Sequence, residues 1–223
     1  MENSLFGQGY FTIQDEASQL IAHLVNPQEG ETIIDACCGP GGKLSHIYEL
    51  GQEKITLIGV EKNKDQMDKA KHTMARLGHE AVEFVADDFL KYKPAIPPNK
   101  ILLDAPCSGL GVLRRHPEGK WLKTEAIIKD MAIQQKKFIE KALDILPQKG
   151  MLIYSVCSFE LEETIEQQKW IQKKFGDSVE IVSPVALLPD FYKRYVTREN
   201  ILLLFSGNQN EADGFGAFIV RKV

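Results

Sequence analysis

The stretch Thr32-Ile33-Ile34-Asp35-Ala36-Cys37-Cys38-Gly39-Pro40-Gly41-Gly42-Lys43 places a glycine-rich turn between a short apolar run and a helical pattern. Such a turn between a strand and a helix is typical of cofactor sites, because glycine lets the backbone approach a ligand closely. Its spacing differs from Gly-x-Gly-x-x-Gly and from Gly-x-x-x-x-Gly-Lys-[Ser/Thr], which lowers the support for nicotinamide and nucleoside triphosphate cofactors. A plain tight turn is the alternative for this stretch alone.

Strands and helices alternate along the chain after this turn. Apolar runs predict strands at residues 32–34, 55–60, 82–86, 101–103 and 151–154, and helical periodicity predicts helices at residues 43–50, 64–77, 124–146 and 161–175. Two more apolar runs, 201–205 and 215–220, flank the turn residues Asn208, Asn210 and Gly214 and predict an antiparallel hairpin that closes one sheet edge. The pattern predicts an α/β fold, Rossmann-like, with a mostly parallel seven-stranded sheet.

The composition is that of one globular domain. The chain has 223 residues, 43% hydrophobic and 26% charged, so we expect residues 1–223 to form a single domain, with residues 1–30 as its N-terminal segment. No membrane-length apolar run and no secretory signal is present, which predicts a cytoplasmic protein. The four cysteines lack Cys-x-x-Cys spacing and predict free thiols, without a metal site or a disulfide framework.

Acidic residues end the next two predicted strands. Glu61 follows the second strand at a spacing suited to ribose hydroxyls, and Asp87 follows the third, where an acid could bind an adenine amino group, with Asp88 as the alternative. Each acid alone is typical of a solvated strand end. A glycine turn, an acid and an acid at three successive strand ends favour an S-adenosylmethionine site.

Two cysteines also follow predicted strands, Cys107 in Leu103-Asp104-Ala105-Pro106-Cys107-Ser108-Gly109 and Cys157 in Tyr154-Ser155-Val156-Cys157-Ser158. Ligand sites of open α/β sheets lie beyond the carboxyl ends of the strands, so both thiols could face one crevice. A thiolate that adds to C6 of cytosine turns C5 into a nucleophile for a methyl group, an acid supports N3, and a base removes the C5 proton. Cys157, Asp104 and Cys107 could supply these functions. The alternatives are buried structural cysteines and a loop-capping aspartate.

These motifs together resemble those of the Sun (RsmB/NSUN) family of RNA cytosine-5 methyltransferases. The similarity extends over residues 9–222 and rests on the two cysteine motifs, the turn at residues 35–43, and the segments Gly9-Tyr10-Phe11-Thr12-Ile13-Gln14-Asp15-Glu16-Ala17-Ser18, Arg114-Arg115-His116-Pro117, Lys120-Trp121 and Asp213-Gly214-Phe215. The resemblance implies that Cys157 is the nucleophile, that Cys107 assists product release, and that Asp104 contacts both cytosine and cofactor.

The same resemblance implies a set of cofactor ligands. Glu61 contacts the ribose and Asp87 the adenine, while the methionine part lies against the turn residues Cys37, Cys38, Gly39, Pro40, Gly41, Gly42 and Lys43. The chain departs from the family pattern at Cys38-Gly39, where two alanines are usual, at Val156, where threonine is usual, and at Thr164, where asparagine is common. Loss of the threonine hydroxyl could remove a hydrogen bond that orients the cysteine loop.

The segment from Arg114 to Lys123 has four Arg or Lys residues against one acid, a local charge of +3, although the net charge of the chain is −4. Basic residues beside an aromatic residue suit single-stranded RNA, so we expect Arg114, Arg115, His116 and Lys120 to bind the substrate; a solvated loop is the alternative. The target cytosine must be unpaired or flipped. We expect no separate RNA-binding domain in this chain, and a separate RNA-binding partner is one source of target specificity.

The sequence therefore predicts transfer of a methyl group from S-adenosylmethionine to C5 of a cytosine in RNA, in rRNA rather than tRNA. Two alternatives stay open: a methyltransferase for a protein or small molecule, and a non-catalytic RNA-binding or assembly factor with this fold.

Overall fold

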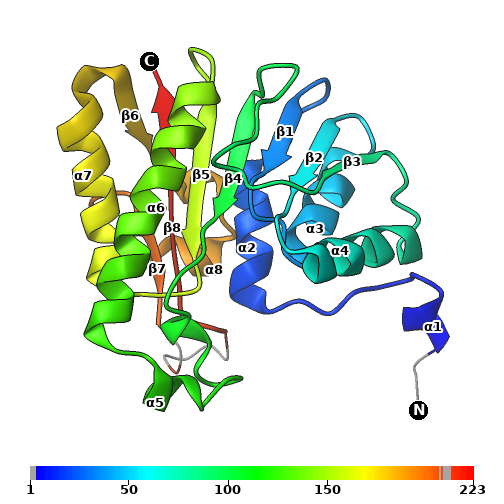
Figure 1. Cartoon of the computed structure of the whole chain (residues 1–223), viewed down its shortest axis with the longest axis horizontal. Helices are drawn as coiled ribbons and strands as arrows, with labels where there is room; N and C mark the ends of the chain where they lie inside the picture. Colours follow the sequence, from blue (N-terminus) through cyan, green and yellow to red (C-terminus); the bar gives the residue numbers. More distant parts are fainter. Residues whose placement is uncertain (1–3, 206, 208–211) are drawn as a thin grey trace.

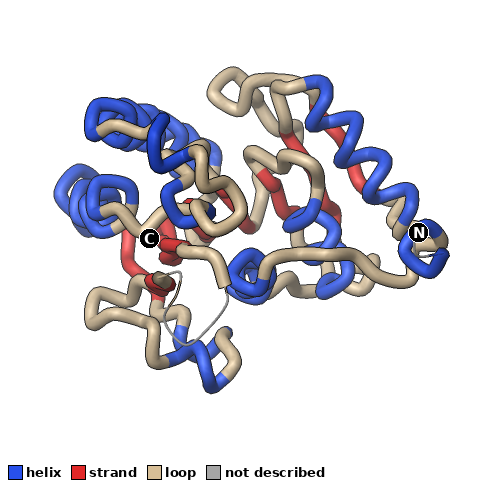
Figure 2. Tube along the Cα trace, turned by 90° about the horizontal axis from the view of Figure 1, so that it is seen from below, coloured by secondary structure: helices blue, strands red, loops and turns tan. Residues whose placement is uncertain are grey.

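The computed structural model describes residues 4–205, 207 and 212–223, which form one sheet with helices on both sides (Figures 1 and 2). The strands are β1 (Thr32–Asp35), β2 (Thr56–Val60), β3 (Val82–Val85), β4 (Lys100–Asp104), β5 (Met151–Val156), β6 (Val179–Val182), β7 (Leu202–Leu204) and β8 (Phe215–Lys222). The helices are α1 (Ser4–Gly7), α2 (Glu16–Val25), α3 (Gly42–Gly51), α4 (Lys64–Arg76), α5 (Gly119–Leu122), α6 (Glu125–Ile145), α7 (Ile165–Phe175) and α8 (Asp190–Lys193). Short 3-10 turns include η1 (Leu110–Val112) and η2 (Leu161–Glu163).

The sheet has the order β3-β2-β1-β4-β5-β8-β6, and β7 pairs with β8 beside this path. The first five strands of the path are parallel, and β8 runs antiparallel to β5, β6 and β7. The chain order reverses between β1 and β4. Ligands of open α/β sheets bind at such a switch point, so the fold predicts a ligand site at the carboxyl ends of β1 and β4.

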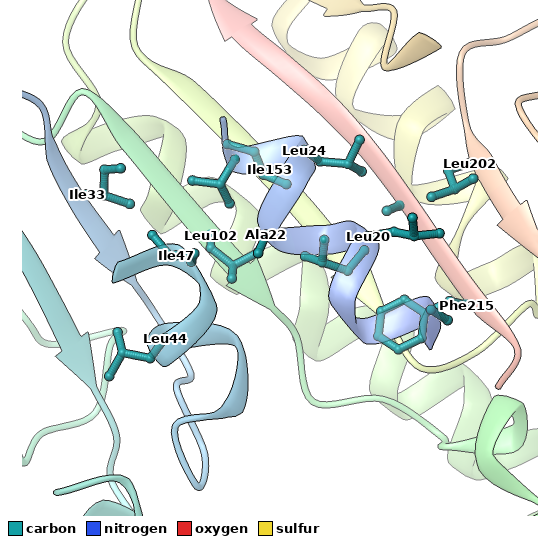
Figure 3. Close-up of a cluster of buried hydrophobic side chains, with 14 of the residues drawn as sticks. Leu20, Ala22, Leu24, Ile33, Leu44, Ile47, Leu102, Ile153, Leu202 and Phe215 are labelled. Carbon is teal, nitrogen blue, oxygen red and sulfur yellow. The ribbon is translucent and has the colours of Figure 1, made fainter. Parts of the chain in front are cut away.

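Because successive side chains of a strand point to opposite faces of the sheet, neighbouring residues of the strands pack into two separate cores. Ile33 faces α2, α3 and α4, whereas its neighbour Ile34 faces α6 and α7. Figure 3 shows the first core, where α2 lays Leu20, Ala22 and Leu24 across the sheet. The predicted N-terminal segment thus contributes a helix to the core.

The sequence prediction of a mostly parallel α/β sheet with an antiparallel C-terminal pair is confirmed, with one correction. The hairpin does not close the edge of the sheet, because β6, which the apolar pattern missed, pairs with β8 on the outside. β8 therefore lies inside the sheet, and β7 is an eighth strand in addition to the seven of the path. The predicted turn residues Asn208 and Asn210 lie outside the described residues.

Local signals mark the boundaries of two of the predicted helices. The Asn63 side chain accepts from the Gln66 amide at the start of α4, and Thr124 accepts from the Ile127 amide at the start of α6. α6 ends before Pro147, which cannot continue a helix. Within the described part of the chain, no helix is both long and apolar enough to cross a membrane.

Candidate active site

A cleft of about 410 Å³ lies at the carboxyl ends of β1, β4 and β5. The glycine turn after β1, Asp104 at the end of β4 and Cys157 after β5 all reach it. Its lining is Ile13, Gln14, Asp15, Ser18, Asp35, Cys37, Cys38, Gly39, Pro40, Gly42, Lys43, Asp104, Val112, Arg115, His116, Cys157, Asp213 and Phe215. The structure therefore brings these three strand ends together at one cleft.

The glycine turn is braced from both neighbouring elements. Gly41 has a φ of +89°, and a Cβ there would lie 3.0 Å from the Cα of Ala70 in α4, so a side chain at this position is strained and crowded. Glu61 accepts a hydrogen bond from the Gly39 amide at 3.1 Å, and Thr73 donates to the Pro40 carbonyl at 3.1 Å. The turn is thus pre-formed with its open side toward the cleft.

Lys43 and Asp104 join the two strands at the switch point. The Lys43 Nζ lies 2.7 Å from Asp104 Oδ2, and Ser155 donates to the other carboxylate oxygen at 2.8 Å. Burial alone would lower the pKa of Lys43, but the attraction of Asp104 outweighs it and keeps this pKa above its ordinary value. Lys43 also lies 5.1 Å from the ring centre of Phe215. The pair fixes the Asp104 carboxylate at the cleft wall.

Asp35 is a site residue for which the sequence suggested no role. Its side chain is buried, lines the cleft, and has no hydrogen-bond partner on either oxygen among the described residues. Burial, with a smaller contribution from the nearby Asp104, raises the pKa of Asp35 to about 7. Two orphaned buried acceptors facing a cleft are suited to a ligand that donates hydrogen bonds or carries positive charge.

The two strand-end thiols touch. Cys107 Sγ and Cys157 Sγ are 3.1 Å apart, and both residues are half-buried. The hydrogen bond with Cys107 lowers the pKa of Cys157, and the positive charge of Lys43 lowers it further. The same hydrogen bond, together with burial, raises the pKa of Cys107 well above its ordinary value. Of the two thiols, Cys157 is the better thiolate.

The other cysteines are different in character. Burial raises the pKa of both Cys37 and Cys38, which are therefore poor thiolates. Cys38 packs against the cores of α3 and β2, and its sulfur would lie 3.2 Å from a Cβ at Gly59. These surroundings are those of packing residues rather than of nucleophiles.

Three chain segments meet at Gly111, which bonds to both the Cys157 loop and Gly214. Its amide donates to the Cys157 carbonyl at 3.0 Å, and its own carbonyl accepts from the Gly214 amide at 2.8 Å. A Cβ at Gly111 would lie 1.9 Å from the Gly214 oxygen and 2.9 Å from the Cys157 oxygen. Only glycine permits this approach, which registers the two cysteine loops against each other.

The basic segment after the Cys107 loop is partly neutralised by residues far away in the chain. Arg115 Nε donates to the buried Asp213 carboxylate at 2.8 Å. Arg114 lies 3.6 Å from Asp15 and 3.8 Å from Asp213. His116 is 3.3 Å from Glu118. The net positive charge around this segment is therefore lower in the folded protein than the +3 counted along the sequence. Arg115 is held at the cleft wall in a fixed orientation.

The predicted residues do not all converge on the cleft. Cys107, which contacts Cys157, is not part of its lining, and neither is Gly41. Also outside the lining are Glu61, Asp87, Arg114 and Lys120. Asp87 is exposed, and its carboxylate accepts from the Asp88 amide, while the Asp88 carboxylate accepts from the Leu90 amide.

The sequence assigned no role to several lining residues that it had noted only as motif matches. These are Ile13, Gln14, Asp15, Ser18, Asp213 and Phe215. Their contacts explain the omission: the Asp213 amide donates to Asp15 at 3.3 Å across 198 positions of chain. Only the presence of their motifs at the two ends of the chain could have indicated a shared site.

Comparison with known proteins places this geometry in context. A sequence profile described as 16S rRNA methyltransferase RsmB/F matches residues 22–218. Ribosomal RNA small subunit methyltransferase B of Yersinia pseudotuberculosis is 37% identical over 164 residues, which are 73% of this chain and 38% of the relative. The chain thus matches well under half the length of this curated relative.

Solved structures show the same fold. NSun6 from Pyrococcus horikoshii with SFG superposes with a TM-score of 0.84 at 30% identity, over 100% of this chain and 56% of that one. A methyltransferase homolog protein from Pyrococcus horikoshii superposes with a TM-score of 0.83 at 26% identity, over 99% of this chain and 71% of that one.

Proposed function

Because the chain belongs to the 16S rRNA methyltransferase RsmB/F family, we propose that it methylates C5 of a cytosine in RNA through a covalent bond between Cys157 and C6 of the base. The observation that carries the proposal is the pair of thiols 3.1 Å apart beside the Lys43–Asp104 ion pair at the cleft. Few other reactions need a thiolate and a carboxylate at one small cleft with a second thiol in contact with the first.

Cys157 acts first in this scheme. Its lowered pKa supplies a thiolate at the cleft wall, which adds to C6 and leaves an electron-rich C5. As negative charge develops at N3 of the ring, the Lys43–Asp104 pair, held by Ser155, donates a proton to N3 through Asp104. C5 then takes the methyl group and still carries its proton.

Cys107 acts last. Removal of the C5 proton requires Cys107 as a thiolate, although the free site keeps it protonated. The largest cause of its raised pKa is the hydrogen bond to Cys157, and this bond partner is lost when Cys157 becomes a thioether. Cys107 can then lose its proton to solvent and accept the one on C5. As the C5–H electrons form the C5–C6 double bond, the C6–S bond breaks and Cys157 leaves as a thiolate.

The cleft fits S-adenosylmethionine, which supplies an electrophilic methyl group when bound. The orphaned oxygens of Asp35 offer acceptors to its positively charged methionine part, and the open backbone of the turn at residues 37–43 lies against the same part. Glu61 and Asp87, at the ends of β2 and β3, are proposed for the ribose and adenine. β2 and β3 are the next strands of the sheet beyond β1, so both acids lie along the same sheet edge as the glycine turn.

RNA is the proposed substrate, and ribosomal RNA is favoured over transfer RNA by the family description. Arg115 and His116 line the cleft, and Trp121, 83% exposed, lies beside Lys120 on the adjoining helix α5. An exposed aromatic ring next to basic groups suits an unpaired strand, with the target cytosine flipped into the cleft. A ribosomal substrate places the enzyme in the cytoplasm, and a separate RNA-binding partner could add affinity.

The test is methyl transfer to total RNA, with 5-methylcytosine as the product measured. Wild type is expected to form it. The Cys157→Ala variant is expected to lose at least about 1,000-fold in rate, since a covalent step is abolished. The Cys107→Ala variant should accumulate a protein–RNA adduct on ordinary RNA, because release is the step it lacks.

The rival functions give different results. A methyltransferase for proteins or small molecules needs no thiol adduct, so Cys157→Ala would keep nearly full turnover of such a substrate. A non-catalytic RNA-binding factor would bind S-adenosylmethionine and release no methylated product. Either outcome would overturn the proposal.

A further inference from the structure

The Cys107 loop is held by a buried carboxylate that belongs to neither cysteine motif. Glu163, in η2 after the Cys157 loop, is completely buried. Its Oε1 accepts from the Ser108 amide at 2.8 Å, and its Oε2 accepts from the Ser108 hydroxyl at 2.5 Å. Both oxygens act as acceptors, which is the behaviour of an ionised carboxylate.

Gln135 extends this hold to the other side of Cys107. Its side-chain amide donates to the Pro106 carbonyl and to Glu163 Oε1, both at 3.0 Å. The Tyr154 hydroxyl lies 2.9 Å from both Gln135 Oε1 and the Glu163 carbonyl oxygen, which share its single proton, and it completes a buried network. Both neighbours of Cys107 in the chain are therefore fixed by one carboxylate–amide pair.

The charges around the thiol pair are arranged unequally. The negative charge of Glu163 adds to the raising of the Cys107 pKa, after the hydrogen bond to Cys157 and burial. The positive charge of Lys43 adds to the lowering of the Cys157 pKa. Asp104 raises the pKa of both thiols. The nearby Tyr154 hydroxyl, whose pKa burial raises, stays neutral.

We propose that Glu163 is the positioning residue that keeps the proton of the thiol pair on Cys107 and thereby leaves the negative charge on Cys157. A carboxylate close to one of two hydrogen-bonded thiols disfavours a thiolate on that side. The inference rests on the proposed roles of the two cysteines. It adds the residue that makes Cys157, rather than Cys107, the thiolate. Glu163 touches neither base nor cofactor in this scheme and acts through the Cys107 loop.

The experiment measures thiol alkylation and needs neither RNA nor S-adenosylmethionine. The protein is treated briefly with limiting iodoacetamide at pH 7, and the label is quantified on the tryptic peptides 101–114, with Cys107, and 150–169, with Cys157. In wild type, Cys157 should react at least about tenfold faster, the effect of one pKa unit. In Glu163→Gln, which keeps shape and removes charge, the ratio should fall below about threefold.

Glu162→Gln is the matched control, because it removes the same charge one position away from a side chain outside this network. It should keep the wild-type ratio within about twofold. If Glu163→Gln does not fold, as judged by circular dichroism, Glu163→Asp replaces it. The shorter acid keeps the charge and should keep the preference for Cys157.

Equal alkylation of the two cysteines in wild type would overturn the inference, as would an unchanged ratio in folded Glu163→Gln. A folded Glu163→Asp that loses the preference would show that shape rather than charge is responsible, and would overturn it too. Failure of the proposed function appears elsewhere, in the methyl-transfer assay, so the two failures are distinguishable.

Discussion

The two cysteine loops look alike in sequence and differ in their surroundings. Each has a cysteine followed by a serine just beyond a parallel strand, and the two serine hydroxyls, of Ser108 and Ser158, even bond to each other at 3.3 Å. Behind Cys107 lies a buried carboxylate network, whereas Cys157 opens on the cleft near a lysine. The thiols of two similar motifs thus differ in pKa, and the difference comes from residues outside both motifs.

The largest effect is expected where the loops are registered against each other. Gly111→Ala forces a Cβ into the Gly214 and Cys157 carbonyls, so the backbone must shift. We expect unfolding free energy to fall by about 1–3 kcal/mol. Methyl transfer should fall roughly 100-fold, because small misplacements of reacting groups are costly. Urea unfolding and initial rates measure the two effects.

Gly7→Ala is the control, since a Cβ there meets nothing within 4 Å. It should behave like wild type in both measurements. A Gly111→Ala variant with normal activity would mean that the close contact does not position the thiols.

The next effect comes from removal of the lysine on the Cys157 side. Without the positive charge, Lys43→Met should raise the pKa of Cys157, so that less thiolate is present at neutral pH. Alkylation of Cys157 at pH 7 should slow by up to about tenfold, and its pH profile should move to higher pH. Lys91→Met removes an exposed lysine outside the cleft and should change neither. A pH profile that stays in place in Lys43→Met would contradict the assigned effect.

Much of this arrangement could be predicted from the sequence, because strand ends are visible in it. The apolar runs place Asp104, Cys107 and Cys157 at the carboxyl edge of a parallel sheet, and the structure brings them together. Glu163 could not be recognised in the same way. It belongs to a polar helical stretch, and only the packing of η2 against α6 buries it beside Ser108.

The local charge of +3 counted for residues 114–123 overestimated the free positive charge, for a related reason. A window of ten residues around Arg115 cannot include Asp15 or Asp213, which approach it only through the fold. The edge strand β6 was missed because four half-buried residues carry too little pattern. Long-range pairing, rather than local propensity, decides both features.

A third, smaller effect concerns the buried acid on the cleft floor. The pKa of Asp35 is about 7 in the folded protein and near 3.8 ordinarily, so ionisation opposes folding. Stability contributed by the protonated form is lost as pH rises from about 4 to about 7. Asp35→Asn should therefore gain stability over wild type between pH 5 and pH 8, by roughly 2–3 kcal/mol.

Urea unfolding at pH 5 and pH 8 measures this difference. The exposed Asp144→Asn control should show the same difference from wild type at both values of pH. An Asp35→Asn difference that is independent of pH would show that this carboxyl group does not carry the raised pKa.

The smallest effect concerns the residue before Cys157. Val156 is completely buried in the sheet core opposite Gly216, so the hydroxyl of Val156→Thr would be buried there. Unfolding free energy should fall by about 1–2 kcal/mol, with methyl transfer within about threefold of wild type. The equally buried Val220→Thr should be destabilised similarly. A rate gain above tenfold in Val156→Thr would mean that the cysteine loop lacks a hydrogen bond that threonine restores.

The inequality of the two thiols is tested most directly by mapping the trapped adduct. RNA that contains 5-fluorocytosine cannot lose its C5 substituent as a proton, so the covalent complex with the enzyme and S-adenosylmethionine persists. After digestion with nuclease and trypsin, mass spectrometry locates the nucleotide. We predict it on peptide 150–169, attached to Cys157. A nucleotide on peptide 101–114, attached to Cys107, would reverse the roles of the two loops, and the absence of any adduct would contradict the covalent mechanism.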